Sequence, residues 1–218
     1  MKSELLKRIL TSTILLPILF FMTLYSGVYM ITLLTIFYFL SLYEVIKNTK
    51  SILFIFVAGI ILLFSFYSFY FLRGDSNYSL IMLLWILTTT FFSDIGGYIF
   101  GKTFKGKKLT RISPNKTYSG AIGSFILSCF SLPLINFLQL FFIGELKINF
   151  LNLKFLVLAI FISLICQLGD LIVSFLKRKV KIKNISNFLP GHGGILDRID
   201  GLMFVLIFCF LLKCLMLI

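Results

Sequence analysis

The chain has 218 residues, of which 59% are hydrophobic and 13% are charged, with a formal net charge of +13. A soluble domain is about 45–50% apolar and about 25% charged, so this composition excludes a soluble protein and indicates an integral membrane protein. The charge does not indicate a nucleic-acid-binding protein, because the basic residues stand in short clusters between apolar stretches. This placement indicates a membrane surface or anionic ligands near it. The four cysteines are scattered without a C-x-x-C spacing, so we expect free thiols.

Seven apolar stretches are long enough to cross a bilayer, which takes about 20 residues as a helix. We therefore predict an all-α, polytopic membrane bundle of about seven transmembrane helices. In chain order the stretches are 9–26, 28–46, 51–72, 79–100, 119–143, 153–176 and 196–217. No small-residue cleavage site follows the first stretch, so we expect it to remain as a helix of the mature protein.

The basic residues predict the orientation of these helices. All but four of the 21 lysines and arginines fall on one side of the predicted topology. The exceptions are Arg73, Lys147, Lys154 and Lys213. Because cytoplasmic loops carry an excess of basic residues, we expect the N-terminus and the loops 102–118 and 177–195 to face the cytoplasm.

Of the eight acidic residues, Asp94, Asp170, Asp197 and Asp200 fall inside the apolar stretches or at their cytoplasmic ends. An unpaired aspartate at the bilayer centre costs about 2.5–3.5 kcal/mol on insertion scales. The segment ends that carry these four aspartates adjoin the two most basic loops. We therefore expect carboxylates and cations to meet at one face of the membrane.

The sixth stretch ends in "GDLIVSFLKR". On a helix Asp170, Ser174 and Lys177 follow one another at i, i+4 and i+7, so they share a side. This side could hold a ligand, or Asp170 and Lys177 could only neutralise each other.

The seventh stretch begins with "GGILDRIDG". Asp197 and Asp200 share a face at i and i+3, and they repel each other unless a cation lies between them. Mg²⁺ takes a couple of carboxylates together with water and substrate phosphates. Pairing with Arg198 or with loop lysines is the structural alternative.

The segment "PGHGG" before this helix holds His192, the only histidine, followed by Gly193 and Gly194. Glycines let the backbone approach a ligand closely, and successive N–H groups can bind an anion. His192 is a candidate either for catalysis or for simple hydrogen bonding.

The loop 102–118 contains "SPNKT". Ser113, Lys116 and Thr117 offer hydroxyl and ammonium donors to phosphate oxygens. The lysines upstream of this segment also suit binding to lipid headgroups.

The segment "GGYIFGKT" matches the P-loop pattern G-x-x-x-x-G-K-[ST]. A P-loop follows a buried strand and opens a helix, whereas this segment closes a long apolar stretch. We therefore predict that it is not a nucleotide-binding P-loop.

The segment "SFLKRKVKIKNISNFLPGHGGILDRID" resembles the signature of the phosphatidate cytidylyltransferases (CDP-diacylglycerol synthases). Two further blocks, "SDIGGYIFGK" at 93–102 and "SPNKTYSGAIG" at 113–123, resemble this family in the same order. The residues that fit the signature are Ser174, Lys177, Arg178, Lys183, Pro190, His192, Gly193, Gly194, Asp197, Arg198 and Asp200. The resemblance covers about the C-terminal 60% of the chain, so we divide it into 1–78, variable transmembrane helices, and 79–218, the catalytic part.

Four positions depart from the family pattern. Val173 stands where the family usually has an acidic residue, and Asn184 replaces the acid of a Lys-Asp pair. Ser119 and Gly97 stand where Glu or Gln and Ala are common. The departures at Val173 and Asn184 remove two carboxylates from the expected site.

The resemblance implies an enzyme that transfers CMP from CTP to phosphatidic acid, giving CDP-diacylglycerol and pyrophosphate, in a bacterial inner membrane. It implies Mg²⁺ as cofactor, with a second cation and a homodimer left open, and no nucleic-acid partner. The implied metal ligands are Asp170 and Asp197, with Asp200 as a further candidate; Lys177, Arg178 and His192 complete the catalytic set. The implied substrate-binding residues are Asp94, Ser113, Lys116, Thr117, Ser174, Gly193, Gly194 and Arg198.

Three other functions are alternatives to this one. A CDP-alcohol phosphatidyltransferase also uses membrane aspartates, but its D-x-x-D-G pattern needs an Ala-Arg pair where Phe204 and Val205 stand. A transporter requires polar residues near the midplane and a repeat between halves, and neither is evident. An inactive family relative is the third alternative, raised by Val173 and Asn184.

Overall fold

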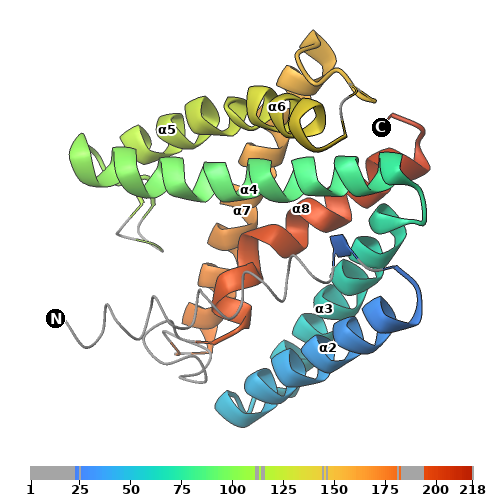
Figure 1. Cartoon of the computed structure of the whole chain (residues 1–218). Coiled ribbons are helices and arrows are strands. Elements are labelled where there is room, and N and C mark those ends of the chain that lie inside the picture. The colour runs from blue at the N-terminus through green and yellow to red at the C-terminus, as the bar shows by residue number, and fades with distance from the viewer. Residues whose placement is uncertain are drawn as a thin grey trace, which may run out of the picture.

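The computed structural model describes residues 23–24, 26–110, 113, 116–143, 145, 147–180, 182 and 194–217. These residues form seven helices (Figure 1) and an isolated β-bridge between Lys108 and Thr117. The helices are α2 (Val28–Asn48), α3 (Ile52–Arg73), α4 (Asn77–Thr103), α5 (Tyr118–Cys129), α6 (Ser131–Ile143), α7 (Leu153–Lys179) and α8 (Leu196–Cys214). The first predicted stretch, 9–26, lies almost entirely outside the described residues.

Within the described residues, five spans are long and apolar enough to cross a membrane. They are α2, α3, α4, α7 and the α5–α6 pair, which counts as one span, Tyr118–Phe141. Helix α8 has 19 residues but carries Asp197, Arg198, Asp200 and Lys213, so it has more charges than a simple apolar span. The prediction of an all-α integral membrane protein is confirmed.

The predicted stretch 119–143 is divided into α5 and α6, which meet at Phe130. Pro133 lies in the first turn of α6. Proline lacks an N–H group, and its ring clashes with the carbonyl of the residue four positions earlier. That residue is Cys129, where α5 ends, so the proline explains the division.

Close packing of small residues joins α4 to α5. A Cβ atom on Gly96 would lie 2.3 Å from the carbonyl oxygen of Gly123, and one on Gly123 would lie 2.3 Å from Cγ of Phe100. Close approach at small residues such as these glycines is a common way for membrane helices to associate. The "GGYIFGKT" segment therefore lies within α4 and packs against α5, which confirms that it is not a P-loop.

A second pair of glycines brings α7 against α8, which lie side by side in Figure 1. A Cβ atom on Gly201 would lie 2.7 Å from Sγ and 3.0 Å from the backbone oxygen of Cys166, and one on Gly169 would lie 2.7 Å from the ring of Phe204. The chain neighbours of these glycines are Asp170 and Asp200. The close approach of the two helices therefore brings two of the predicted site residues together.

The N-terminal helices complete the bundle. Helices α2 and α3 pack against each other, and α3 packs along α8 (Figure 1). An apolar cluster at this junction includes Val45, Leu62, Val173 and Leu196. A larger apolar cluster, which includes Trp85, has buried members from α2, α3, α4, α6, α7 and α8.

Candidate active site

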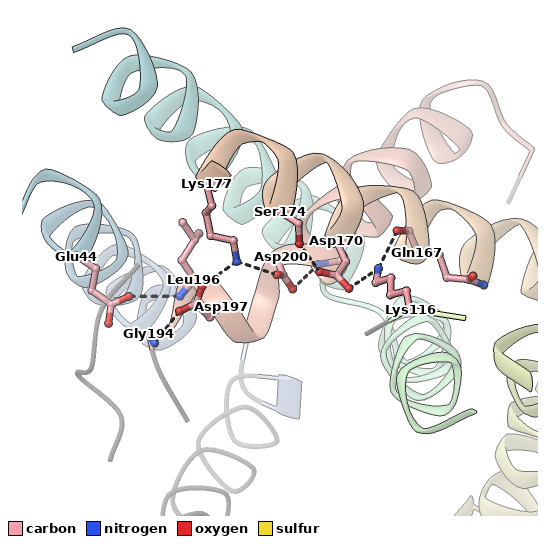
Figure 2. A network of polar contacts seen from close by, with 11 residues as sticks. Glu44, Lys116, Gln167, Asp170, Ser174, Lys177, Gly194, Leu196, Asp197 and Asp200 are labelled. Atoms are coloured by element: carbon pink, nitrogen blue, oxygen red, sulfur yellow. Dashed lines mark hydrogen bonds and ion pairs between the residues drawn. The ribbon is translucent and has the colours of Figure 1, made fainter. Parts of the chain in front are cut away.

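A buried lysine joins the end of α7 to the start of α8. Lys177 lies in the last turn of α7 and is 7% exposed. Its Nζ atom lies 2.9 Å from Oδ1 of Asp197 and 3.7 Å from Oδ2 of Asp200 (Figure 2). Pairing of the two α8 aspartates with a lysine, one of the alternatives that the sequence leaves open, is present in the structure; a cation bound by these aspartates stays a prediction.

A second ion pair connects the loop before α5 to α7. Nζ of Lys116 lies 2.5 Å from Oδ2 of Asp170 and donates a hydrogen bond to the backbone oxygen of Gln167 at 3.3 Å. The hydroxyl of Ser174 donates to Oδ1 of Asp170 at 3.5 Å. Asp170 is therefore held by Lys116, a residue of the "SPNKT" segment, and Figure 2 shows Lys116 reaching α7.

The two ion pairs belong to one electrostatic cluster. The carboxylate of Asp200 is repelled by those of Asp170 and Asp94. Asp94 of α4 also accepts a hydrogen bond from the thiol of Cys166 at 3.4 Å. The positive charges of Lys116 and Arg198 stabilise its negatively charged carboxylate. Residues from α4, the loop before α5, α7 and α8 thus converge, as the sequence predicts.

This donor set suits a hard divalent cation bound together with substrate phosphates. Across the described residues, no group of three or more His, Cys, Asp and Glu side chains is arranged to hold a metal ion. Asp170 and Asp200 nevertheless offer two mutually repelling carboxylates, and Mg²⁺ commonly uses one or two carboxylates plus phosphate oxygens. Asp197 is bound more tightly to the protein, since Oδ1 meets Lys177 and Oδ2 accepts the N–H of Gly194 at 3.1 Å.

Three predicted site residues have other roles or positions in the structure. The hydroxyl of Thr117 caps α5 by accepting the N–H of Gly120 at 3.1 Å. The carbonyl of Ser113 accepts the N–H of Lys116 at 3.1 Å within the loop. Arg178 is exposed, unlike its neighbour Lys177. Their contacts with a substrate stay predictions.

The "PGHGG" segment is described only at its last residue. His192 and Gly193 lie outside the described residues, as do Lys183, Asn184 and Pro190. Gly194 is buried, and its N–H donates to Asp197. The end of the predicted anion-binding loop therefore adjoins the carboxylate cluster.

One acidic residue that no sequence motif marked also contacts this region. Glu44 of α2 is 2% exposed, and its carboxylate accepts the backbone N–H groups of Ile195 at 3.1 Å and Leu196 at 3.4 Å. A carboxylate within an apolar stretch is by itself a reason to expect a specific role.

Val173, one of the four positions that depart from the family pattern, is buried. It belongs to the apolar cluster that also holds Val45 of α2 and Leu196 of α8.

The chain matches the model of the "Cytidylyltransferase family" over residues 47–215. It is similar to a phosphatidate cytidylyltransferase of Bacillus subtilis, with 37% identity over 174 residues, which is 78% of this chain and 62% of the relative. It is also similar to proteins of that name from Rickettsia conorii (38% identity; 64% of this chain, 60% of the relative) and Staphylococcus haemolyticus (40% identity; 65% and 51%). The chain thus spans less than two thirds of the length of these relatives.

Proposed function

The chain belongs to the cytidylyltransferase family, and we propose that it transfers CMP from CTP to phosphatidic acid, producing CDP-diacylglycerol and pyrophosphate. Its similarity to relatives named phosphatidate cytidylyltransferase supports the choice of substrates. The observation that carries the proposal is the cluster of ion-paired lysines and aspartates where α7 meets α8. The cluster lies at the helix ends of a membrane bundle, where a lipid phosphate and a water-soluble nucleotide could meet.

In the proposed reaction a phosphate oxygen of phosphatidic acid attacks the α-phosphorus of CTP. A new P–O bond forms as the bond from the α-phosphorus to the bridging oxygen breaks, and pyrophosphate leaves with that electron pair. Such a transfer depends mainly on positioning and on spreading negative charge. No general base is required, because phosphatidic acid is already an anion.

The lysines would bind phosphate oxygens when the substrates arrive. Lys177 is buried between Asp197 and Asp200, and Lys116 reaches Asp170 from a separate loop. Charge-assisted hydrogen bonds from ammonium groups to phosphate are short and strong. Both lysines could exchange or share their carboxylate partners with a substrate phosphate without leaving the site.

We propose Asp170 and Asp200 as the principal Mg²⁺ ligands, with Asp197 retained as a third candidate. Bound there, Mg²⁺ would offset charge on the CTP phosphates and the departing pyrophosphate. Asp94, Ser174 and Arg198 surround this position and are proposed to orient the substrates. Arg178, Ser113, Thr117 and the 192–194 segment remain proposed phosphate contacts.

We also propose that this face of the bundle is cytoplasmic, in a bacterial inner membrane. The basic residues gather in the loops 102–118 and 177–195, and cytoplasmic loops favour such residues. A homodimer and a second cation remain open parts of the proposal.

The test uses purified protein in detergent with phosphatidic acid and labelled CTP, with and without Mg²⁺. We expect CDP-diacylglycerol to form only with Mg²⁺, and to be lost in Asp170→Ala. Asp75→Ala is the matched control, because Asp75 is an exposed aspartate in the short α3–α4 loop, at the far end of α3. Absence of product from correctly folded wild-type protein would exclude the proposed reaction.

A further inference from the structure

Glu44 is a buried carboxylate that connects the variable N-terminal helices to the candidate active site. It lies on α2, near the helix end, and is 2% exposed. Its Oε1 atom accepts the N–H of Ile195 at 3.1 Å, and Oε2 accepts the N–H of Leu196 at 3.4 Å. Figure 2 shows the carboxylate directed at the start of α8. A buried charge is expensive unless it is hydrogen-bonded, so these contacts account for an acid in this place.

The start of α8 needs such a partner. The first N–H groups of a helix have no acceptor within the helix, and the residue before α8, Ile195, has no side chain that could supply one. By contrast, α3 and α4 begin with Ser51 and Ser76, whose hydroxyls accept a backbone N–H in the next turn. Glu44 supplies the acceptor from another helix, and its negative charge also suits the positive end of the helix dipole.

The capped start of α8 leads directly into the candidate catalytic carboxylates. Asp197 lies one residue after Leu196, and Asp200 follows three residues later. Both reach Lys177 of α7, at 2.9 and 3.7 Å. A shift or fraying of this turn would therefore change the distance from each carboxylate to the lysine.

Apolar contacts strengthen the same junction. Val45, next to Glu44, is fully buried and belongs to one apolar cluster with Leu196 and Val173. Helix α2 thus meets the start of α8 through the hydrogen-bonded carboxylate of Glu44, and Val45 and Leu196 belong to one apolar cluster beside it.

We infer that Glu44 is a positioning residue for the transfer reaction: by binding the first turn of α8 it sets Asp197 and Asp200 against Lys177. This inference rests on the proposed function. It assigns a role in the active site to a helix from the part of the chain in which the sequence shows no family motif.

The experiment compares Glu44→Gln with Glu44→Asp, measuring kcat and KM for both substrates, the melting temperature, and hydrogen exchange of the 194–201 segment. Gln keeps the size but loses the charge and turns one acceptor oxygen into a donor, whereas Asp keeps the charge and both acceptors on a shorter stem. We expect Glu44→Gln to lower kcat about 10–100-fold, the range for residues that orient functional groups, with a much smaller change in KM and faster exchange in 194–201. Glu44→Asp should restore part of the lost kcat and slow the exchange in 194–201 part of the way back to the wild-type rate.

Two controls separate positioning from general stabilisation. Ser76→Ala removes a side-chain cap at the far end of the bundle, where the Ser76 hydroxyl accepts the N–H of Ser79 at 3.1 Å. Glu145→Gln makes the same chemical change at an exposed position. Neither should change kcat or exchange in 194–201, even if Ser76→Ala lowers the melting temperature as much as Glu44→Gln does.

If Glu44→Gln speeds exchange in 194–201 but leaves kcat unchanged, Glu44 is not a positioning residue. If Glu44→Gln leaves the exchange unchanged, Glu44 does not hold the start of α8. An equal loss of kcat in Ser76→Ala and Glu44→Gln would also overturn the positioning role, because the effect would then follow stability alone. Absence of product from the wild-type protein would instead exclude the proposed function, while the exchange measurement would still decide whether Glu44 holds the start of α8.

Discussion

The two ends of α8 adjoin buried or half-buried cations that have different kinds of partner. At its start, Lys177 is 7% exposed and binds the carboxylates of Asp197 and Asp200. Near its end, Arg73 of α3 is 6% exposed and donates to backbone oxygens, among them that of Leu24 at 3.0 Å and that of Gly74 at 2.9 Å. Lys213 donates likewise to the backbone oxygens of Phe71 and Leu72.

The difference shows that a buried charge in a membrane bundle does not by itself mark an active site. The last carbonyl groups of a helix lack partners within the helix and attract cations, so Arg73 and Lys213 have a sufficient structural reason to be where they are. Lys177 instead faces two carboxylates on one helix face, and a third carboxylate, that of Asp170, repels Asp200. Excess negative charge of this kind would be stabilised by a further cation, whereas Arg73 and Lys213 already have backbone oxygens as partners.

The largest expected effect follows removal of one carboxylate from the cluster at the start of α8. Asp170→Asn and Asp200→Asn should each lower kcat by more than about 100-fold, since loss of a ligand should exceed the 10–100-fold typical of residues that only orient ligands. Asp197→Asn should lower kcat less than these two substitutions, because Asp197 contacts Lys177 and the N–H of Gly194. Initial rates of labelled CDP-diacylglycerol formation over a range of Mg²⁺ concentrations measure this order. A larger loss in Asp197→Asn than in Asp200→Asn would reverse the preference for Asp200 as metal ligand.

The next effect compares the two buried cations directly. Lys177→Met leaves Asp197 and Asp200 buried without their common partner, which typically destabilises a protein by about 3–5 kcal/mol, and it should abolish most of the activity. Arg73→Met leaves backbone carbonyls without donors, which should lower the free energy of unfolding by about 1–3 kcal/mol. The kcat of the folded protein should stay unchanged. Melting temperature in detergent and initial rate, measured on the same preparations, separate the two cases. Loss of kcat in stable Arg73→Met protein would contradict the comparison.

A smaller effect is expected from pushing α7 and α8 apart. Gly201→Ala places a Cβ atom 2.7 Å from Sγ and 3.0 Å from the backbone oxygen of Cys166. Overpacking of this kind costs about 1–3 kcal/mol, and here it should also lower kcat about tenfold, because misplacement of reacting groups by about 1 Å can cost up to 100-fold. Gly123→Ala, which meets Phe100 between α4 and α5, is the matched control and should lower the melting temperature with less effect on kcat. Equal effects on kcat would show that the α7–α8 distance is not special.

The smallest effect is expected at the far end of α8. Lys213→Met removes two hydrogen bonds to backbone oxygens and a contact 5.1 Å above the Phe71 ring. Lys213 is only half-buried, so water can replace its ammonium group. We therefore expect the free energy of unfolding to fall by about 0.5–1.5 kcal/mol and kcat to stay unchanged. Thermal unfolding measures the first quantity and the rate assay the second. A change in kcat comparable to that of Lys177→Met would mean that the two ends of α8 are coupled.

Much of this comparison was predictable from residues close together in the chain. The spacing of Asp197 and Asp200 within one helical turn, and the run of cations after Asp170, indicated a polar site at the ends of two helices. Hydropathy likewise predicted the helices, because a membrane segment must satisfy its backbone hydrogen bonds internally. The break between α5 and α6 was not predicted, although Pro133 marks it, because the flanking stretch is apolar throughout.

The sequence by itself determined that this is an all-helical membrane protein and which aspartates and lysines are available at the ends of its helices, because length, hydropathy and local spacing are properties of neighbouring residues. Only the tertiary structure decided the partners: Lys177 with Asp197 and Asp200, Lys116 with Asp170, and Glu44 with the first turn of α8. These pairs depend on how closely and at what rotation separate helices pack. That packing is governed by contacts such as Gly201 against Cys166, between residues that are distant in the chain.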